Sequence, residues 1–173
     1  VASRGLGDVY KRQVEYNEII LASATIQDGV GNAYGEGIIS IGIENDFEIS
    51  ELQFELEFSP AFVEITGVVA LERTTFDSFI IENNIVTLIN PSITSGAGNI
   101  LNLQLFNNVG VETDVDVVYS MCIGYTSDGS EIGISIQDNA NYLIQGVDQY
   151  FIVQSGNGAV GGGASYTLSL IHI

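Results

Sequence analysis

Apolar and polar residues alternate with a period of two in several segments of the chain. Isoleucine occupies every second position of 39–43, and leucine or phenylalanine every second position of 52–58. The same period recurs over 63–71, 101–105 and 132–136. Alternate side chains of a strand point to opposite faces, so each segment predicts a strand with one buried and one solvated face.

Turn signals separate these segments. The first apolar run, 19–26, ends at Asp28-Gly29, and Asn83-Asn84 predicts a tight hairpin turn between two further strands, 76–81 and 85–89. Ser127-Asp128-Gly129-Ser130 turns the chain after the segment 117–125, which is apolar on both faces and therefore predicts a central strand. No segment has a helical period.

Repeated alternation with many β-branched residues predicts an all-β protein, an antiparallel β-sandwich. The register is set by burial, because a slip of one residue would bury Glu55 and Glu57. The apolar positions of the predicted strands supply the expected core, which includes Ile41, Leu52, Phe54, Leu56, Ile65, Leu88, Leu103, Met121 and Ile134.

The two ends of the chain resemble translated sequencing adapter. Residues 8–13 can be written as GAT GTG TAT AAG AGA CAG, whose reverse complement translates as Leu-Ser-Leu-Ile-His-Ile, residues 168–173. This DNA matches the mosaic-end adapter of transposase-based libraries. We therefore interpret residues 1–13 and 168–173 as adapter-derived and disordered, in a fragment of environmental (metagenomic) DNA.

The remaining chain divides into a domain, 14–147, and a Gly-rich tail or linker, 148–167. Within that tail, the apolar run Tyr150–Val153 predicts either a last strand or the beginning of a following module. Removing the ends takes Asp8 from the 22 acidic residues and three of the 4 basic ones, which leaves 21 acidic residues and the single cation Arg73.

The net charge of the whole chain is −18, which excludes nucleic acid and anionic lipid as partners, because both require basic surface. No apolar run is long enough to insert into a membrane. Strong self-repulsion favours a monomer and suits a saline, extracellular or cell-surface setting. The one Cys excludes an intramolecular disulfide framework.

Three segments together resemble the cohesin-type module. The order IISIGIENDFEISELQFELEFSPAFVEITGV (38–68) is similar to its opening, with Ser59-Pro60 in the place of its Pro-containing turn. GNILNLQLFN (98–107) and YSMCIGYTSDGSEIGISI (119–136) resemble its later long strand and closing hairpin. The resemblance implies a nine-stranded jelly roll, related to a group of cellulose-binding modules, in secreted multi-modular bacterial proteins.

Well-known cohesin modules bind dockerin modules and so assemble polysaccharide-degrading enzymes. The resemblance implies that the strand near residue 54 lies in the partner-binding face, and alternation directs its acidic stripe outward to steer a basic partner. Asn102 and Gln104 project from another strand and add hydrogen-bonding groups. The candidate partner-binding residues are Glu51, Gln53, Glu55, Glu57, Asn102 and Gln104.

Other chemistry has weaker support in the sequence. Glu55 and Glu57 lie two apart on one strand, but a flat strand supplies no cleft for glycosidase chemistry. Direct polysaccharide binding usually needs exposed aromatic side chains, and the chain has no Trp. Tyr34 and Tyr142, in predicted loops, are the remaining candidates. Cys122 is expected to be a small buried apolar residue.

Calcium is a candidate ligand, although neither acidic segment has the spacing of an EF-hand loop. No other cofactor is expected. The first segment is a loop leading into a strand and the second a turn, which together carry Glu112, Asp114, Asp116, Asp128, Ser130 and Glu131. Arg73 is expected to pair with a carboxylate near Glu72 or Asp77.

These observations favour a non-catalytic protein-interaction or carbohydrate-associated module of a larger secreted or cell-surface protein, with a dockerin-like protein or a polysaccharide as its partner. The alternative is a structural sandwich module of an adhesin or a phage virion. An enzyme is the least favoured, since the chain without its ends has no His or Lys.

Deleting residues 1–13 and 168–173 is expected to leave the melting temperature unchanged, because no packing was selected in adapter-derived sequence. Differential scanning calorimetry of the full and shortened chains measures the difference. A fall of many degrees would show that these ends belong to the folded protein.

Overall fold

The computed structural model describes residues 20–137, 139–146, 150–153 and 167–170. These residues form strands, turns and loops, and no helix among them is long and apolar enough to cross a membrane. The strands are β1 (Ile20–Asn32), β2 (Glu36–Asn45), β3 (Glu51–Ser59), β4 (Val63–Ala70), β5 (Thr74–Thr75), β6 (Ser78–Glu82), β7 (Ile85–Ile89), β8 (Ser92–Ile93), β9 (Asn99–Asn107), β10 (Thr113–Tyr125), β11 (Glu131–Ile136), β12 (Ala140–Gln145), β13 (Tyr150–Val153) and β14 (Thr167–Leu170).

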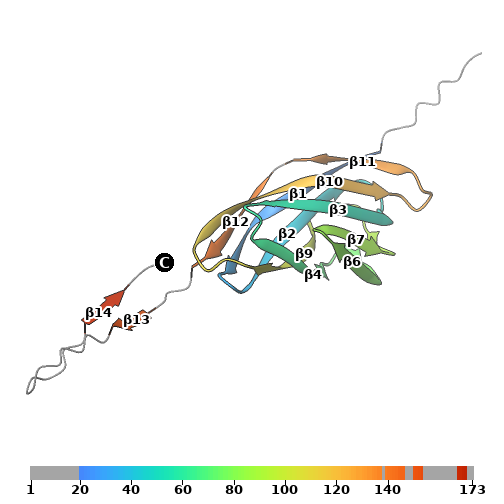
Figure 1. The fold of residues 1–173 in the computed structure, drawn as a ribbon. Helices are drawn as coiled ribbons and strands as arrows, with labels where there is room; N and C mark the ends of the chain where they lie inside the picture. Colours follow the sequence, from blue (N-terminus) through green and yellow to red (C-terminus); the bar gives the residue numbers. More distant parts are fainter. Residues whose placement is uncertain (1–19, 138, 147–149, 154–166, 171–173) are drawn as a thin grey trace, which may run out of the picture.

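Ten strands make one sheet that folds over into a sandwich (Figure 1). One layer has the order β4-β9-β2-β1, and the other has the order β10-β3-β7-β6. The strands β11 and β12 pair with both β1 and β10, so they join the two layers along one side. The predicted jelly-roll sandwich is confirmed, and β11 with β12 together take the place of a ninth long strand.

Alternation decides which side of each strand is buried. In β2 and β9 the buried positions fall at every second residue over most of their length, and in β3 every second residue from Leu52 to Phe58 is buried. The inward-facing side chains of both layers pack into one core between them. Within one layer, Phe54 of β3 and Tyr119 of β10 make an edge-to-face contact, with ring centroids 6.1 Å apart. Most of the predicted core is confirmed, namely Ile41, Leu52, Phe54, Leu56, Ile65, Leu88 and Leu103, while Ile134 is partly buried against it.

Two of the predicted turns have the backbone that their residues favour. Asn83 and Asn84 both have positive φ, 52° and 64°, which is the geometry of a two-residue hairpin between β6 and β7. In the turn after β10, Gly129 has a φ of 82°, and Asp128 accepts hydrogen bonds from the Thr126 hydroxyl and the Ser130 N–H. These two bonds lower the pKa of the Asp128 carboxyl. The Ser59-Pro60 turn after β3 contains a cis peptide bond.

β-bulges make strict alternation fail in two strands. In β4 the register shifts between Ile65 and Gly67, so Val68 is buried while Val69, expected on the buried side, is exposed. In β10 the shift between Tyr119 and Met121 turns Cys122 inward and leaves Met121, expected in the core, half-buried on the outer side. Both expectations were wrong because an extra residue exchanges the faces of everything after it.

The first strand does not end at Asp28-Gly29, contrary to expectation. These residues lie at a register shift between Gln27 and Val30, after which β1 continues beside β2. Before the shift β1 pairs with β11, and after it with β12, in parallel in both cases. The Asp28 carboxylate accepts a hydrogen bond of 2.8 Å from the Asn141 N–H of β12. This bond lies where β1 changes its partner from β11 to β12.

Arg73 does not pair with the carboxylate expected near Glu72 or Asp77. Within the described chain its guanidinium donates to the carbonyl oxygens of Ile43, Thr94 and Gly96 and to Asn45 Oδ1, over 2.6–2.9 Å. The cation therefore holds the end of β2 to the loop after β8, and its ligands are neutral oxygens.

Tyr142, expected in a loop, is fully buried in β12 and fills the space between three strands. Its hydroxyl donates to Asn107 Oδ1 over 3.0 Å, and Asn107 Nδ2 donates to the Asn32 carbonyl over 2.9 Å. A methyl group at Gly31 or Gly37 would lie 1.9 or 1.7 Å from the Tyr142 oxygen, so both positions require glycine.

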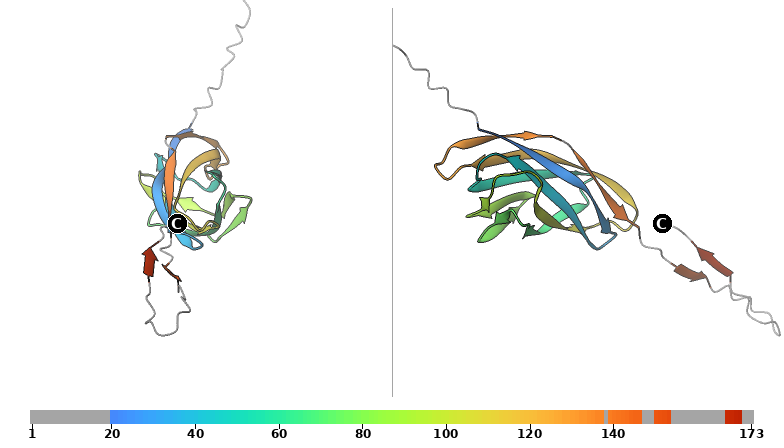
Figure 2. Two further views of the ribbon diagram at one scale, coloured as in Figure 1. Left: turned by 60° about the vertical axis from the view of Figure 1, so that its left-hand side comes forward. Right: turned by 180° about the vertical axis from the view of Figure 1, so that it is seen from behind.

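Tyr150–Val153 forms a strand, β13, which pairs with β14 and not with a strand of the sandwich. Three residues of β14, Leu168–Leu170, belong to the segment interpreted as adapter, so the expectation that this end is disordered is wrong for them. The two strands form a sheet of their own, apart from the ten-stranded sheet (Figures 1 and 2). The expectations for residues 1–13, 154–166 and 171–173 lie outside the described residues.

Replacing Tyr142 with Phe is expected to lower the free energy of unfolding by about 1–3 kcal/mol, because Asn107 Oδ1 loses its buried donor. Urea denaturation monitored by fluorescence or circular dichroism measures the change. Tyr34→Phe is the matched control, since Tyr34 is exposed in the turn between β1 and β2. Equal stability of the two variants would contradict a structural role for the buried hydrogen bond.

Candidate interaction face

The outer side of β10, β3, β7 and β6 forms one continuous face, which we call the acidic face. Its side chains lie in rows across the four strands, because paired residues of neighbouring strands point the same way. The rows are Tyr125–Glu51, Ile123–Gln53–Thr87–Ile80, Met121–Glu55–Ile85–Glu82 and Val118–Glu57.

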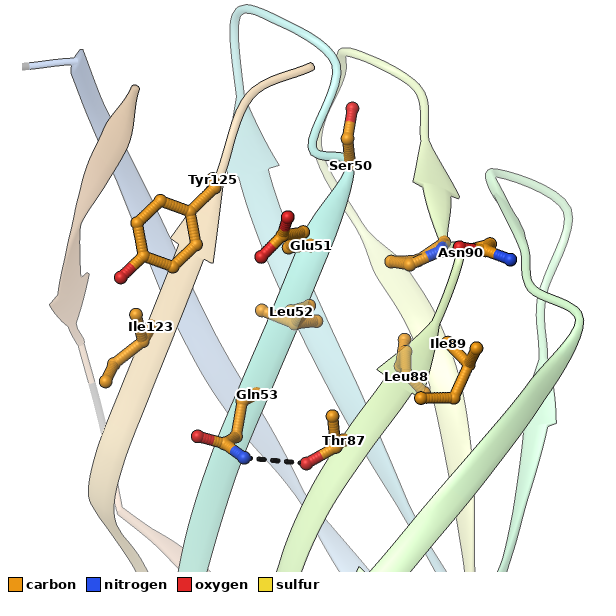
Figure 3. Close-up of a pocket in the computed structure, with 11 residues that line it drawn as sticks. Ser50, Glu51, Leu52, Gln53, Thr87, Leu88, Ile89, Asn90, Ile123 and Tyr125 are labelled. Atoms are coloured by element: carbon orange, nitrogen blue, oxygen red, sulfur yellow. Dashed lines mark hydrogen bonds between the residues drawn. The ribbon is translucent and has the colours of Figure 1, made fainter. Parts of the chain in front are cut away.

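Carboxylates run along the middle of the acidic face on β3. Glu51 and Glu57 are exposed and Glu55 is half-buried between Met121 and Ile85. Gln53 is fixed by a hydrogen bond of 2.7 Å from its Nε2 to Thr87 Oγ1 (Figure 3). Their outward direction follows from the burial of Leu52, Phe54 and Leu56 on the other side of the same strand.

A shallow pocket of 420 Å³ lies at one end of the acidic face. Figure 3 shows Glu51 between Tyr125 of β10 and Asn90, which follows β7. Ile123 and Ile89 supply apolar side chains to the same pocket. The pocket thus combines a carboxylate, a phenol and an amide with apolar walls, which suits a long side chain with a polar tip.

Apolar side chains flank the acidic stripe on both sides, and alternation alone missed them. Met121 and Ile123 on β10 and Ile85 and Ile89 on β7 are half-buried on this face. The signal in the sequence was that 117–125 is apolar on both faces. An apolar border beside a charged stripe is typical of protein interfaces, where apolar contacts anchor and charges steer.

Asn102 and Gln104 do not lie with the other four candidates. They are on β9, which pairs with β2 and β4 in the opposite layer, and they point outward there. Asn102 Oδ1 accepts a hydrogen bond of 2.8 Å from Ser40 Oγ, and Gln104 lines a separate pocket of 360 Å³ with Val30 and Ile38. The structure therefore joins Glu51, Gln53, Glu55 and Glu57 and separates Asn102 and Gln104 from them.

The acidic segments considered for calcium are spread out. Asp114 and Asp116 lie within β10, where they are exposed on either side of buried Val115, and only Glu112 is in the preceding loop. Asp128 and Ser130 bond to each other across their own turn. Among the described residues, no three His, Cys, Asp or Glu side chains gather as metal ligands do.

Cys122 faces the core after the bulge in β10 and packs partly buried against it. Burial raises the pKa of its thiol to about 12. Burial also raises the pKa of the Tyr119 hydroxyl, with a smaller contribution from Cys122. A thiol with so high a pKa remains protonated at neutral pH and is a poor nucleophile.

Several solved structures with a similar fold are cohesin modules. A type I cohesin–dockerin complex from Clostridium thermocellum, with OlpC, matches with a TM-score of 0.57 and 12% identity over 74% of this chain and 96% of that one. The seventh ScaB type I cohesin of Pseudobacteroides cellulosolvens matches with a TM-score of 0.57 and 15% identity, over 75% of this chain and 95% of that one. The cohesin CaCohA2 of Clostridium acetobutylicum matches with a TM-score of 0.56 and 12% identity, over 73% of this chain and 92% of that one.

The chain therefore has the cohesin-type jelly-roll fold, as the sequence resemblance predicted. No protein-family model and no curated protein matches the sequence. At identities of 12–15% the likeness is one of architecture, and the function has to be argued from the residues of the acidic face.

Native Cys122 is expected to react with a thiol reagent at pH 8 on the order of a thousandfold more slowly than in the unfolded chain, whose thiol has a pKa of about 8.5. A raised pKa leaves fewer thiolates at any pH below it. Labelling with and without 8 M urea, followed by mass spectrometry, measures both rates. Rapid labelling of the folded protein would show that Cys122 is accessible and ionised.

Proposed function

We propose that this chain is a non-catalytic protein-interaction module that binds its partner through the acidic face. The observation that carries the proposal is the combination found there, a stripe of carboxylates on β3 bordered by apolar side chains of β10 and β7. The cohesin fold supports it, since one solved structure with that fold is a cohesin–dockerin complex.

The partner is a protein with Lys or Arg in its contact surface, of the dockerin kind or similar in charge. Glu51, Glu55 and Glu57 attract it over a distance and raise the association rate. Met121, Ile123 and Ile85 then bury apolar surface and slow dissociation. These roles are physically separate, and kinetics can distinguish them.

Two features support the absence of catalysis. The pocket beside Glu51 is lined by one carboxylate and by no His, Cys or Lys, and the thiol of Cys122 is partly buried with a raised pKa. The fold likeness also supports the wider setting of the proposal, a larger secreted or cell-surface bacterial protein associated with polysaccharide breakdown.

Changing Glu55 and Glu57 together to Gln is expected to slow association roughly threefold at low salt and to leave the dissociation rate nearly unchanged, because the changes remove steering charge and no apolar contact. The partner is first captured from a panel of dockerin modules on the immobilised chain. Surface plasmon resonance at two salt concentrations then gives both rate constants.

The matched control changes Glu36 and Glu64 to Gln. These carboxylates are exposed on the outer side of the opposite layer, on either side of Phe106, so the net charge changes equally. The control is expected to associate at nearly the unmodified rate. If the two double variants behave alike at both salt concentrations, the acidic face is only a solvated surface.

A further inference from the structure

β6 is the last strand of its layer, so one of its edges has no hydrogen-bonded strand in the described part of the chain, although β4 of the other layer lies near it (Figure 1). Its five residues, Ser78–Glu82, pair one to one with Ile89–Ile85 of β7 without a shift of register. The pairing of β6 is therefore regular over its whole length.

The hairpin fixes which backbone groups point to this free edge. Glu82 and Ile85 flank the two-residue turn, so they form a hydrogen-bonded pair, and such pairs recur at every second residue of an antiparallel ladder. The N–H and C=O groups of Phe79 and Ile81, which lie between these pairs, point away from β7. They are the groups that an added strand would bind.

Natural edge strands are usually protected by Lys, Pro or a bulge. The other edge of the folded sheet, β4, has a bulge between Ile65 and Gly67. β6 has none of the three, and two of its apolar side chains are exposed, Phe79 by 38% and Ile80 by 49%. Such an edge can accept a further strand.

The charges near β6 indicate which residues an added strand would carry. Exposed Asp77 and Glu82 stand at the two ends of β6, and the one cation of the described chain, Arg73, is occupied by four oxygens elsewhere. A second copy of a chain with a net charge of −18 is repelled. A segment with basic ends and an apolar middle matches both the charge and the apolar side chains.

We propose that β6 binds an extended, basic segment of a partner protein as an added β-strand. Ile80 belongs to the row Ile123–Gln53–Thr87–Ile80, so the added strand would widen the acidic face by one strand. The proposed function relies on outward side chains of β10, β3 and β7 and does not need the free backbone edge of β6, so the two proposals are independent. Failure of one therefore leaves the other standing.

The probe is the capped synthetic peptide Lys-Ile-Thr-Val-Thr-Ile-Lys, and amide hydrogen exchange by NMR is the readout. When about nine-tenths of the sites are occupied, exchange at Phe79 and Ile81 is expected to slow about tenfold, because their N–H groups enter a ladder. The same peptide with Glu at both ends is expected not to bind. Binding of the basic peptide without protection of these two amides overturns the proposal.

Two matched variants separate strand addition from general attraction to an acidic protein. Ile80→Lys places a cation beside the free edge and is expected to weaken the peptide on the order of tenfold. Val69→Lys makes the same charge change on β4, where the valine side chain is 43% exposed against 49% for Ile80. This variant is expected to weaken peptide binding less than twofold. Both positions are solvated, and melting curves check that both variants fold.

Equal weakening by the two variants overturns the proposal in favour of non-specific charge attraction. Protection of Phe79 and Ile81 that appears without peptide and rises with protein concentration, together with a dimer in sedimentation, also overturns it, since the occupant is then a second copy. Protection that requires the basic peptide and is weakened by Ile80→Lys alone supports it.

Discussion

The buried hydroxyl of Tyr142 fixes the strand that closes the sandwich. Its bond to Asn107 and its close approach to Gly31 and Gly37 position β12 against β1, β2 and β9 at once. Because β12 also pairs with β10, the same contact helps to position β10, which lies beside β3. The acidic face is built on that pair, so its geometry depends on a side chain on the opposite side of the sheet.

One side of β3 stabilises the fold, and the other carries the proposed recognition. Leu52, Phe54 and Leu56 supply buried apolar area on one side, and that burial dominates the free energy of folding. Carboxylates on the other side contribute little to stability, since exposed charges are well screened. The outer sequence of this strand can therefore change with the partner without loss of the fold, which helps to explain how a shared architecture persists at identities of 12–15%.

Periodicity and turn residues were sufficient to predict the sandwich, the Asn83-Asn84 hairpin and the outward direction of Glu55. They failed where one extra residue changes the phase, as before Met121, and where a strand changes its partner, as at Asp28. Neither the bulge nor the change of partner has a pattern in the neighbouring residues as clear as the alternation of apolar and polar positions. Asn102 and Gln104 were grouped with β3 because both strands alternate, but alternation gives the side of a strand and not the layer that contains it.

Buried polar contacts were the least predictable part of the fold. Arg73 has two acidic neighbours in sequence, yet its guanidinium bonds to carbonyls of segments more than 20 residues away. Tyr142 was expected in a loop, yet its side chain is fully buried in β12. Both residues are placed by tertiary contacts that form only after the strands have assembled, so their partners cannot be inferred from their neighbours in the chain.

The first and last strands of the sandwich run in parallel. Ile20 pairs with Ile132 at the beginning of β1, whereas Gln145 of β12 pairs with Asn32 at its end. A pulling force applied between Ile20 and Gly146 therefore acts along the strands and loads their hydrogen bonds together in shear, instead of opening them one after another. When the sandwich is stretched from these two ends, β1 and β12 act as a mechanical clamp. Its resistance to unfolding by force then follows from the parallel pairing of the two strands.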